Sequence, residues 1–129
     1  MVSMLATLLA RQARASSGKA SGRLFERAVH HAETHLHAPE LNAQTIAAAI
    51  GVSLSALHDS ARRHGTTIGQ MIQERRLQRC RDALRDKRLE RRQISDIAFA
   101  WGFNDAAHFS RSFRTRFGVT PRAWRRGAD

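Results

Sequence analysis

The feature that most constrains the fold is an internal repeat. The residues Ile46-Ala47-x-x-x-Gly51-Val52 recur as Ile97-Ala98-x-x-x-Gly102-Phe103, so the second copy begins 51 positions after the first. The match continues with small slips, pairing Leu57 with Phe109, Gly65-x-Thr67 with Gly118-x-Thr120, and Met71 with Trp124. Such self-similarity predicts two copies of one small structural unit.

The repeated unit has the packing pattern of a helix-turn-helix. An alanine, Ala47 or Ala98, stands four residues before the glycine of each copy, and an apolar residue follows that glycine by six or seven positions. The small alanine lets two helices cross closely, and the glycine allows the tight turn between them. The second helix of such a motif is free to enter a DNA major groove.

The remaining patterns predict an all-α fold of six or seven short helices. Apolar residues recur at helical spacing from Leu24 onward, and no sustained period-2 run indicates a strand. A long helix is expected from Ile68 to about Leu84, opened by a capping box of Thr67 and Gln70. Its inward positions are Ile68, Met71, Ile72, Leu77, Cys80 and Leu84. The other expected caps are Asn42 with a Leu41–Ile46 staple, Ser53, Asn104 or Asp105, and Thr120 before Pro121.

The charge balance points to nucleic acid as the partner. The chain of 129 residues carries 22 Lys and Arg against 11 Asp and Glu, a formal charge of +11. All of the basic residues except Lys19 and Lys87 are arginine, the side chain whose planar fork suits phosphates and guanine edges. Residues 24–65 have a net charge of −1 and residues 66–129 of +8. The second unit and the long helix should therefore supply most of the affinity for DNA.

Several other classes of protein fit the sequence poorly. A single cysteine, Cys80, excludes an intrachain disulfide and a cysteine-based zinc site, and it favours a cytoplasmic protein. Although His31 and His35 share one predicted helix face, no acidic or cysteine partner completes a metal spacing, so we expect no metal and no cofactor. The apolar opening, residues 1–10, is about half of a membrane span. We expect no membrane association, no small-molecule site and no enzymatic activity.

The motifs resemble those of the AraC/XylS-type bacterial transcription regulators. The resemblance covers Leu24 to Arg126 and is densest in Ile94-x-x-Ile97-Ala98-x-x-x-Gly102-Phe103 and in Phe109-x-x-x-Phe113-x-x-x-Phe117-Gly118-x-Thr120-Pro121-x-x-Trp124-Arg125. Arg76-Leu77-x-x-Cys80 is similar to the family's linker-helix pattern. The resemblance implies two helix-turn-helix subdomains joined by a long helix, double-stranded DNA as partner, and activation through contact with RNA polymerase at the bacterial nucleoid.

The sequence departs from the family pattern in the first unit. Ala61 stands where a phenylalanine is expected, and Asp59 stands where an arginine is frequent. Family members normally carry an upstream sensor or dimerisation domain, and residues 1–23 are interpreted as a tail or linker, a remnant of such a domain. Residues 24–129 form the predicted DNA-binding domain. It divides into a first unit (24–65), the linker helix and its connection (66–92), and a second unit (93–129).

The candidate DNA-binding residues lie on the outward faces of the two predicted reading helices, Ser53–Arg63 and Asp105–Arg116. They are Ser55, Ala56, His58, Asp59 and Arg62 in the first unit and Ala106, Ala107, His108, Ser110, Arg111 and Arg114 in the second. Arg111 is the candidate for a bidentate contact to guanine, and Arg114 for a phosphate contact. His108 is expected either to hold a phosphate or to have a plain surface or capping role. A monomer is expected to read two successive major-groove segments.

Three alternatives share part of this pattern. A nonspecific nucleic-acid-binding helical protein would share the charge but would not need two capped units in register. An enzyme that uses Cys80 as an alkyl acceptor would need an exposed thiol of low pKa, whereas the position on an inward stripe favours a small buried hydrophobe. A protein-interaction module would bind its partner with little dependence on salt. Trp101 and Trp124 are predicted core residues rather than stacking platforms.

Overall fold

The computed structural model describes residues 20 and 22–128 of the chain. These residues form seven α-helices, one short 3-10 helix and no strand, as the periodicity predicts. The N-terminal helix spans residues 22–35, with residue 20 also helical. The others are α2 (Ala43–Ile50), α3 (Leu54–Arg63), α4 (Ile68–Leu84), η1 (Lys87–Leu89), α5 (Ile94–Ala100), α6 (Ala106–Phe117) and α7 (Pro121–Arg125).

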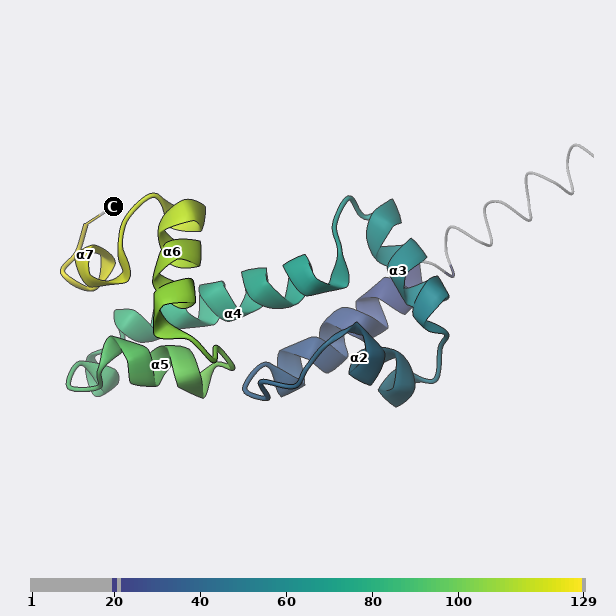
Figure 1. Ribbon diagram of the computed structural model, residues 1–129, viewed down its shortest axis with the longest axis horizontal. Helices are drawn as coiled ribbons and strands as arrows, with labels where there is room; N and C mark the ends of the chain where they lie inside the picture. Colours follow the sequence, from purple (N-terminus) through teal and green to yellow (C-terminus); the bar gives the residue numbers. More distant parts are fainter. Residues whose placement is uncertain (1–19, 21, 129) are drawn as a thin grey trace, which may run out of the picture.

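Two groups of helices lie at opposite ends of α4 (Figure 1). The N-terminal helix, α2 and α3 form the first unit at the beginning of α4, and α5, α6 and α7 form the second unit at its end. Helices α2–α3 and α5–α6 are the two predicted helix-turn-helix pairs. Both turns contain a left-handed glycine, Gly51 with φ +74° and Gly102 with φ +95°, which explains why the repeat requires glycine there.

Each unit has its own hydrophobic core, and α4 contributes to both. The first core contains Ile46, Ala47 and Leu57 together with Ile68, Met71 and Ile72 of α4. The second contains Ile97, Ala98, Phe109 and Phe113 together with Leu77, Cys80 and Leu84 of α4. The six inward positions predicted for the long helix are all buried. Trp101 and Trp124 are half-buried and packed against the core, as predicted, with Trp101 reaching both cores.

Most of the predicted helix starts are confirmed by hydrogen bonds. The side chains of Ser53 and Asp105 accept from backbone N–H groups of α3 and α6. Thr120 caps α7, with Pro121 at the first helical position. Asn42 also caps α2 as predicted, and its backbone N–H donates to the Thr45 hydroxyl oxygen. This helix start is therefore a complete capping box, which the staple pattern did not indicate.

Two local predictions need correction. Thr67 accepts from the Gln70 backbone N–H, but the Gln70 side chain faces the Thr66 hydroxyl at 3.5 Å, so only half of the predicted capping box forms. The N-terminal helix already includes Ala20 and Gly22, which the sequence assigned to a linker. Burial of one helix face, which includes Ala28 and Ala32, stabilises the helix and outweighs the low propensity of glycine at its start. Residues 1–19 and 21 of the predicted tail or linker lie outside the described residues.

Candidate nucleic-acid interface

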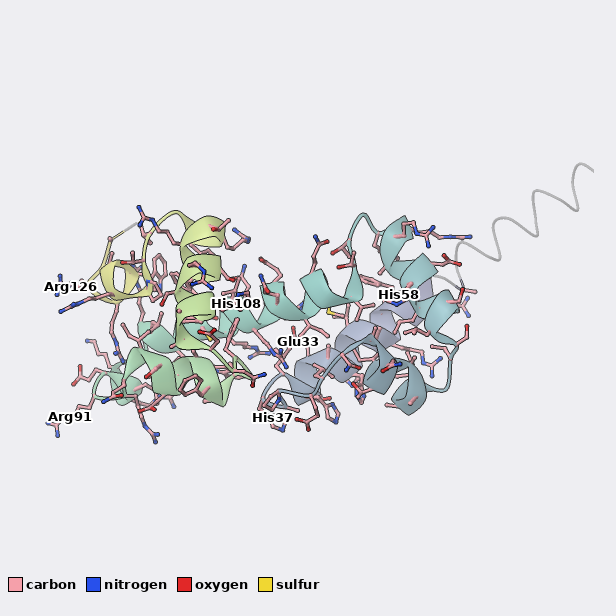
Figure 2. The ribbon with its side chains drawn as sticks, viewed as in Figure 1. Glu33, His37, His58, Arg91, His108 and Arg126 are labelled. Atoms are coloured by element: carbon pink, nitrogen blue, oxygen red, sulfur yellow. The ribbon has the colours of Figure 1, made fainter. Side chains whose placement is uncertain are left out.

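The first candidate reading helix, α3, has one buried and one exposed face. Leu57, Ser60 and Ala61 are buried. Ala61, which stands where the family pattern has a phenylalanine, is fully buried, so this position still belongs to the packed face of α3. The candidate residues Ser55, His58, Asp59 and Arg62 are exposed, and Ala56 is half-buried (Figure 2 labels His58).

Asp59 and Arg62 of α3 are paired with each other. Arg62 Nη2 lies 2.8 Å from Asp59 Oδ1, and both side chains are more than half exposed. The pair places a carboxylate on the face that would meet DNA and occupies the arginine that would otherwise contact a phosphate. This face is therefore weakly suited to bind a polyanion.

The second candidate reading helix, α6, presents a more basic face. Its core stripe of Phe109 and Phe113 is fully buried, and Phe117 packs on Phe113 with ring centroids 4.7 Å apart. Ala107, His108, Ser110, Arg111 and Arg114 are exposed, and Ala106 is half-buried. The structure thus brings the six predicted residues of this unit to the solvent side of one helix.

Asp105 holds the start of α6. Its carboxylate accepts from the backbone N–H groups of Ala107 at 2.8 Å and His108 at 3.1 Å. These hydrogen bonds, first that of His108 and then that of Ala107, lower the pKa of Asp105 below its ordinary value. The carboxylate is therefore committed to the helix start, where the helix dipole also favours negative charge.

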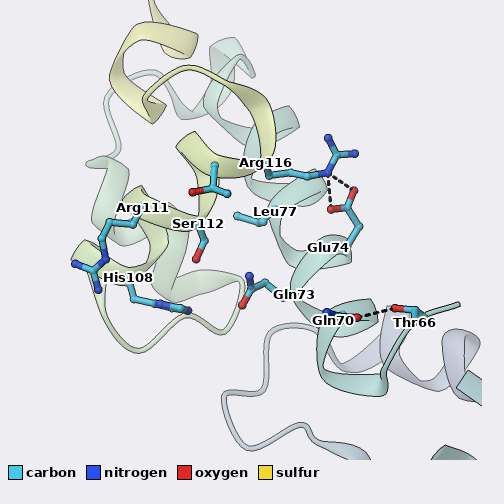
Figure 3. Close-up of a pocket in the computed structure, with 10 residues that line it drawn as sticks. Thr66, Gln70, Gln73, Glu74, Leu77, His108, Arg111, Ser112 and Arg116 are labelled. Carbon is cyan, nitrogen blue, oxygen red and sulfur yellow. Dashed lines mark hydrogen bonds and ion pairs between the residues drawn. The ribbon is translucent and has the colours of Figure 1, made fainter. Parts of the chain in front are cut away.

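A groove of about 620 Å³ separates α6 from α4 (Figure 3). At its far end the Arg116 Nε donates to both carboxylate oxygens of Glu74, at 2.9 and 2.7 Å. Arg111 extends on the opposite side of the groove from this ion pair. The residues lining the groove that were not among the predicted site residues are Thr66, Gln70, Gln73, Glu74, Leu77, Ser112, Thr115 and Arg116. Apart from the buried Leu77, they carry polar or charged side chains on α4, on α6 or just before α4, and this polarity was the only available signal.

The arginines divide into structural and available groups. Arg76, Arg85 and Arg125 each donate two hydrogen bonds to backbone carbonyls. Arg75 and Arg79 pair with Glu33. By contrast, the side chains of Arg111 and Arg114 have no ion-pair partner within residues 22–128. The formal charge of the chain therefore overstates its capacity to bind phosphates, and α6 retains two uncommitted guanidinium groups.

Cys80 and the histidines of the N-terminal helix are the other residues that the sequence offered as a possible nucleophile and possible metal ligands. Cys80 is fully buried in the second core, and burial raises the pKa of its thiol to about 12, as predicted for a hydrophobe and unlike a nucleophile. The His31 and His35 rings stack at 4.0 Å on the N-terminal helix. No group of three metal-ligating side chains occurs in the part of the chain that the structure describes. None of the helices there is long and apolar enough to cross a membrane.

Comparison with known proteins agrees with this geometry of two helix-turn-helix units. The helix-turn-helix domain family matches residues 46–127. The chain is 35% identical over 94 residues to the transcriptional activator NphR of Rhodococcus sp., covering 73% of this chain and 27% of that protein. It is 36% identical over 93 residues to the transcriptional activator RhaS of Enterobacter sp. strain 638, covering 71% of this chain and 32% of that protein. The chain thus spans about a third or less of the length of these relatives.

Solved structures show the same architecture. A transcriptional regulator with an AraC-type DNA-binding domain from Chromobacterium violaceum superposes with a TM-score of 0.74 at 30% identity, covering 84% of this chain and 94% of that one. The C-terminal domain of AraT, a response regulator from Geobacillus stearothermophilus, shares the fold with a TM-score of 0.72 at 22% identity, covering 80% of this chain and 84% of that one.

The fold and the two exposed reading helices define a DNA-binding domain of the double helix-turn-helix class. The chain belongs to the AraC-type helix-turn-helix family, whose members are DNA-binding transcription regulators.

Proposed function

We propose that this chain binds double-stranded DNA sequence-specifically as a monomer, with α3 and α6 in two successive major-groove segments. The observation that carries the proposal is the pair of capped helix-turn-helix units held at the two ends of one helix, each with its second helix exposed (Figure 1). Two reading helices on one scaffold fit an asymmetric site of about two turns, with half-sites about 10 bp apart.

The length of α4 supports bending of the bound DNA. Its 17 residues give a helix of about 25 Å, whereas one turn of B-DNA rises about 34 Å. We propose that the two reading helices are held no farther apart than this length, which is closer than successive major grooves on a straight duplex. Bending costs a few kcal/mol that depends on the flexibility of the base steps, so the sequence between the half-sites contributes to specificity.

The second unit supplies most of the affinity in this proposal. Arg111 makes a bidentate contact to guanine N7 and O6, and Arg114 binds a phosphate. His108 approaches a phosphate, Ser110 contacts a base edge or the backbone, and Ala106 and Ala107 offer apolar contact to a thymine methyl. In the first unit Ser55, Ala56, His58, Asp59 and Arg62 face the groove, where the Asp59 carboxylate limits binding.

At the level of the whole regulator, we propose that DNA binding by this domain activates transcription through contact with RNA polymerase. NphR and RhaS, which are 35% and 36% identical to the chain over the matched region, are both transcriptional activators. The matched region is about a third or less of each of these two relatives. Within residues 24–129 we propose no small-molecule site, no metal and no catalysis, with the nucleoid as the place of action.

Selection from a random duplex library tests the proposal. The purified chain is used at about 150–200 mM salt, where nonspecific phosphate binding is weakened. A two-part motif with half-sites about 10 bp apart is expected. A single half-site would mean that α3 does not read DNA, and no enrichment would support nonspecific binding instead. Substitution of Arg111 by Ala in the same selection identifies the half-site read by α6.

A further inference from the structure

The middle of α4 belongs to neither core. The last α4 residue of the first core is Ile72, and the first α4 residue of the second core is Leu77. The turn between them, residues 73–76, carries exposed or half-exposed side chains. A single helical turn is thus the only part of α4 that joins two separately packed units. Motion between such units is the default unless other contacts prevent it.

Arg76 lies in this turn and reaches back to the first unit. Its Nε donates to the Leu36 carbonyl at 3.0 Å, and its Nη2 donates to the Ala38 carbonyl at 2.6 Å. Both carbonyls follow the end of the N-terminal helix, where backbone acceptors lack helical partners. The planar guanidinium satisfies two of them in one geometry.

The second unit contacts the same point through Gly102. A Cβ added to Gly102 would overlap the Leu36 carbonyl oxygen and lie 2.7 Å from Arg76 Nε. Gly51, the equivalent residue of the first repeat, has a similar left-handed conformation but nothing within 4 Å of such a Cβ. The two glycines therefore make equivalent turns, and only Gly102 also brings one unit against the other.

A second contact crosses between the units beside the first. Trp101 packs against both cores, with the Arg79 guanidinium 5.6 Å from its ring centroid. Arg79 Nη2 also lies 2.7 Å from Glu33 Oε2 of the N-terminal helix, which Figure 2 shows between that helix and α4. The Arg76 and Arg79 contacts together cross the turn that neither core stabilises.

We propose that Arg76 is a positioning residue that, packed against Gly102, fixes the angle between the two helix-turn-helix units and thereby sets the half-site spacing at which one chain binds DNA. The proposal rests on the proposed function for its DNA consequence, because spacing has meaning only if both units bind. Its structural part, the fixed angle, concerns the free chain.

Distance measurements on the free chain test the fixed angle. Spin labels are attached to cysteines introduced at Glu26 of the N-terminal helix and Asp96 of α5, both exposed, while native Cys80 is fully buried. Pulsed electron resonance should give one narrow distance distribution. Arg76→Gln should make this distribution at least about twofold wider. Arg76→Lys, which keeps the charge but not the planar fork, should give a width between those of the unsubstituted chain and Arg76→Gln.

We call the contact of Arg76 and Gly102 with the backbone at residues 36–38 the joint between the units. Two matched controls distinguish loss of the joint from a general loss of stability. Arg85→Gln removes a similar clamp, to the carbonyls of Trp124 and Ala128, that lies outside the joint. Gly51→Ala and Gly102→Ala both strain a left-handed turn, but only the second meets the other unit. Gly102→Ala should widen the distribution, whereas Arg85→Gln and Gly51→Ala should leave it narrow.

The DNA test uses the selected two-part site with its half-sites moved apart or together by about 2 bp. Linkage of two binding modules raises affinity about 10²–10⁴-fold only when both engage at once, so the unsubstituted chain should bind the altered sites about 100-fold more weakly. Arg76→Gln should lose less than about tenfold in affinity, because its two units can move to match the new spacing. Affinity for a single half-site should change equally in Arg76→Gln and Arg85→Gln, which lose the same charge.

The outcomes distinguish the two proposals. A broad distance distribution in the unsubstituted chain would overturn the role of Arg76. So would an Arg76→Gln variant that keeps both a narrow distance distribution and the spacing preference of the unsubstituted chain. If the unsubstituted chain selects no two-part site, reading by both units is wrong, and the link to spacing falls with it. The distance distributions then still decide whether Arg76 fixes the angle between the units.

Discussion

Arg116 of α6 and Glu74 of α4 form an ion pair across the groove that faces the proposed DNA site, with Arg116 Nε 2.7 Å from Glu74 Oε2. The hydrogen bond from Arg116 is the main cause that lowers the pKa of Glu74. The pair ties the last turn of the reading helix to α4 (Figure 3). It also places a carboxylate in the groove that Arg111 lines and engages the Arg116 guanidinium.

Glu74→Gln should therefore tighten DNA binding. The substitution removes a negative charge from the groove and releases Arg116 to bind a phosphate. The slope of log affinity against log salt should therefore become steeper by about one unit, the change expected for one added phosphate contact. Binding to random duplexes, measured by fluorescence anisotropy over a salt series, checks this expectation. Glu90→Gln, an equal charge change at an exposed position between η1 and α5, should have a smaller effect. Equal effects of both substitutions would contradict a local role.

Arg111→Ala should cost about 1–3 kcal/mol of binding to the selected site and relax specificity at one base pair, because a bidentate guanine contact is lost. The measurement is binding to the selected site and to its single-base variants. Arg91→Ala, an equal charge change on the loop before α5, provides the control. If Arg111→Ala weakens binding to random DNA just as much, Arg111 contacts only phosphate.

Arg114→Ala should weaken binding to all sequences alike. A phosphate contact carries no base preference, and its loss should make the salt dependence shallower by about one unit. Titrations of selected and random duplexes at several salt concentrations measure both quantities. An unchanged slope, or a change in the selected motif, would show that this assignment is wrong.

The elements that the sequence predicts well are those specified by local pattern. Gly51 and Gly102 are required by a local backbone conformation, Thr120-Pro121 by helix-start chemistry, and Ile68–Leu84 by apolar periodicity. Each signal lies within a few residues of the structure it specifies. The bounds of α4 and the exposed face of α6 therefore agree with prediction.

The features that sequence reasoning missed depend on contacts between distant residues. Arg76 donates to a carbonyl 40 positions away, and Arg116 pairs with a glutamate 42 positions away. Arg76 belongs to the linker-helix motif and Arg116 to none, but neither the motif nor the spacing names the acceptor, since an arginine in a basic chain gives no sign of whether it faces DNA or a carbonyl. Counting charges therefore overestimated the available phosphate-binding groups and gave no indication of the joint.

Asp105→Ala should lower the melting temperature and weaken binding by the second unit, because two N–H groups at the start of α6 lose their acceptor. Asp105→Asn, which can still accept, should retain most of the stability. Since the folded-state pKa of Asp105 lies below its unfolded value, its contribution is present above the ordinary aspartate pKa and is lost as pH falls through the lowered value. Melting curves of the original chain and Asp105→Ala should thus converge in acid. A constant difference at every pH would contradict a role for the ionised carboxylate.

Asp59→Asn tests whether the first unit is held back by its own charge. The Asp59 carboxylate pairs with Arg62 at 2.8 Å on the exposed face of α3, so its removal both ends a repulsion with phosphate and releases the guanidinium. Affinity for random DNA should rise, and the salt dependence should steepen by about one unit.

Glu26→Gln removes the same charge from an exposed position on the N-terminal helix and should change binding less. In a random-library selection, Asp59→Asn should strengthen the half-site read by α3 relative to that read by α6. A contrary result has a definite meaning, because a carboxylate can accept from cytosine N4. If Asp59→Asn instead loses preference for one C·G pair, then Asp59 reads a base and the first unit gains specificity from the charge that limits its affinity.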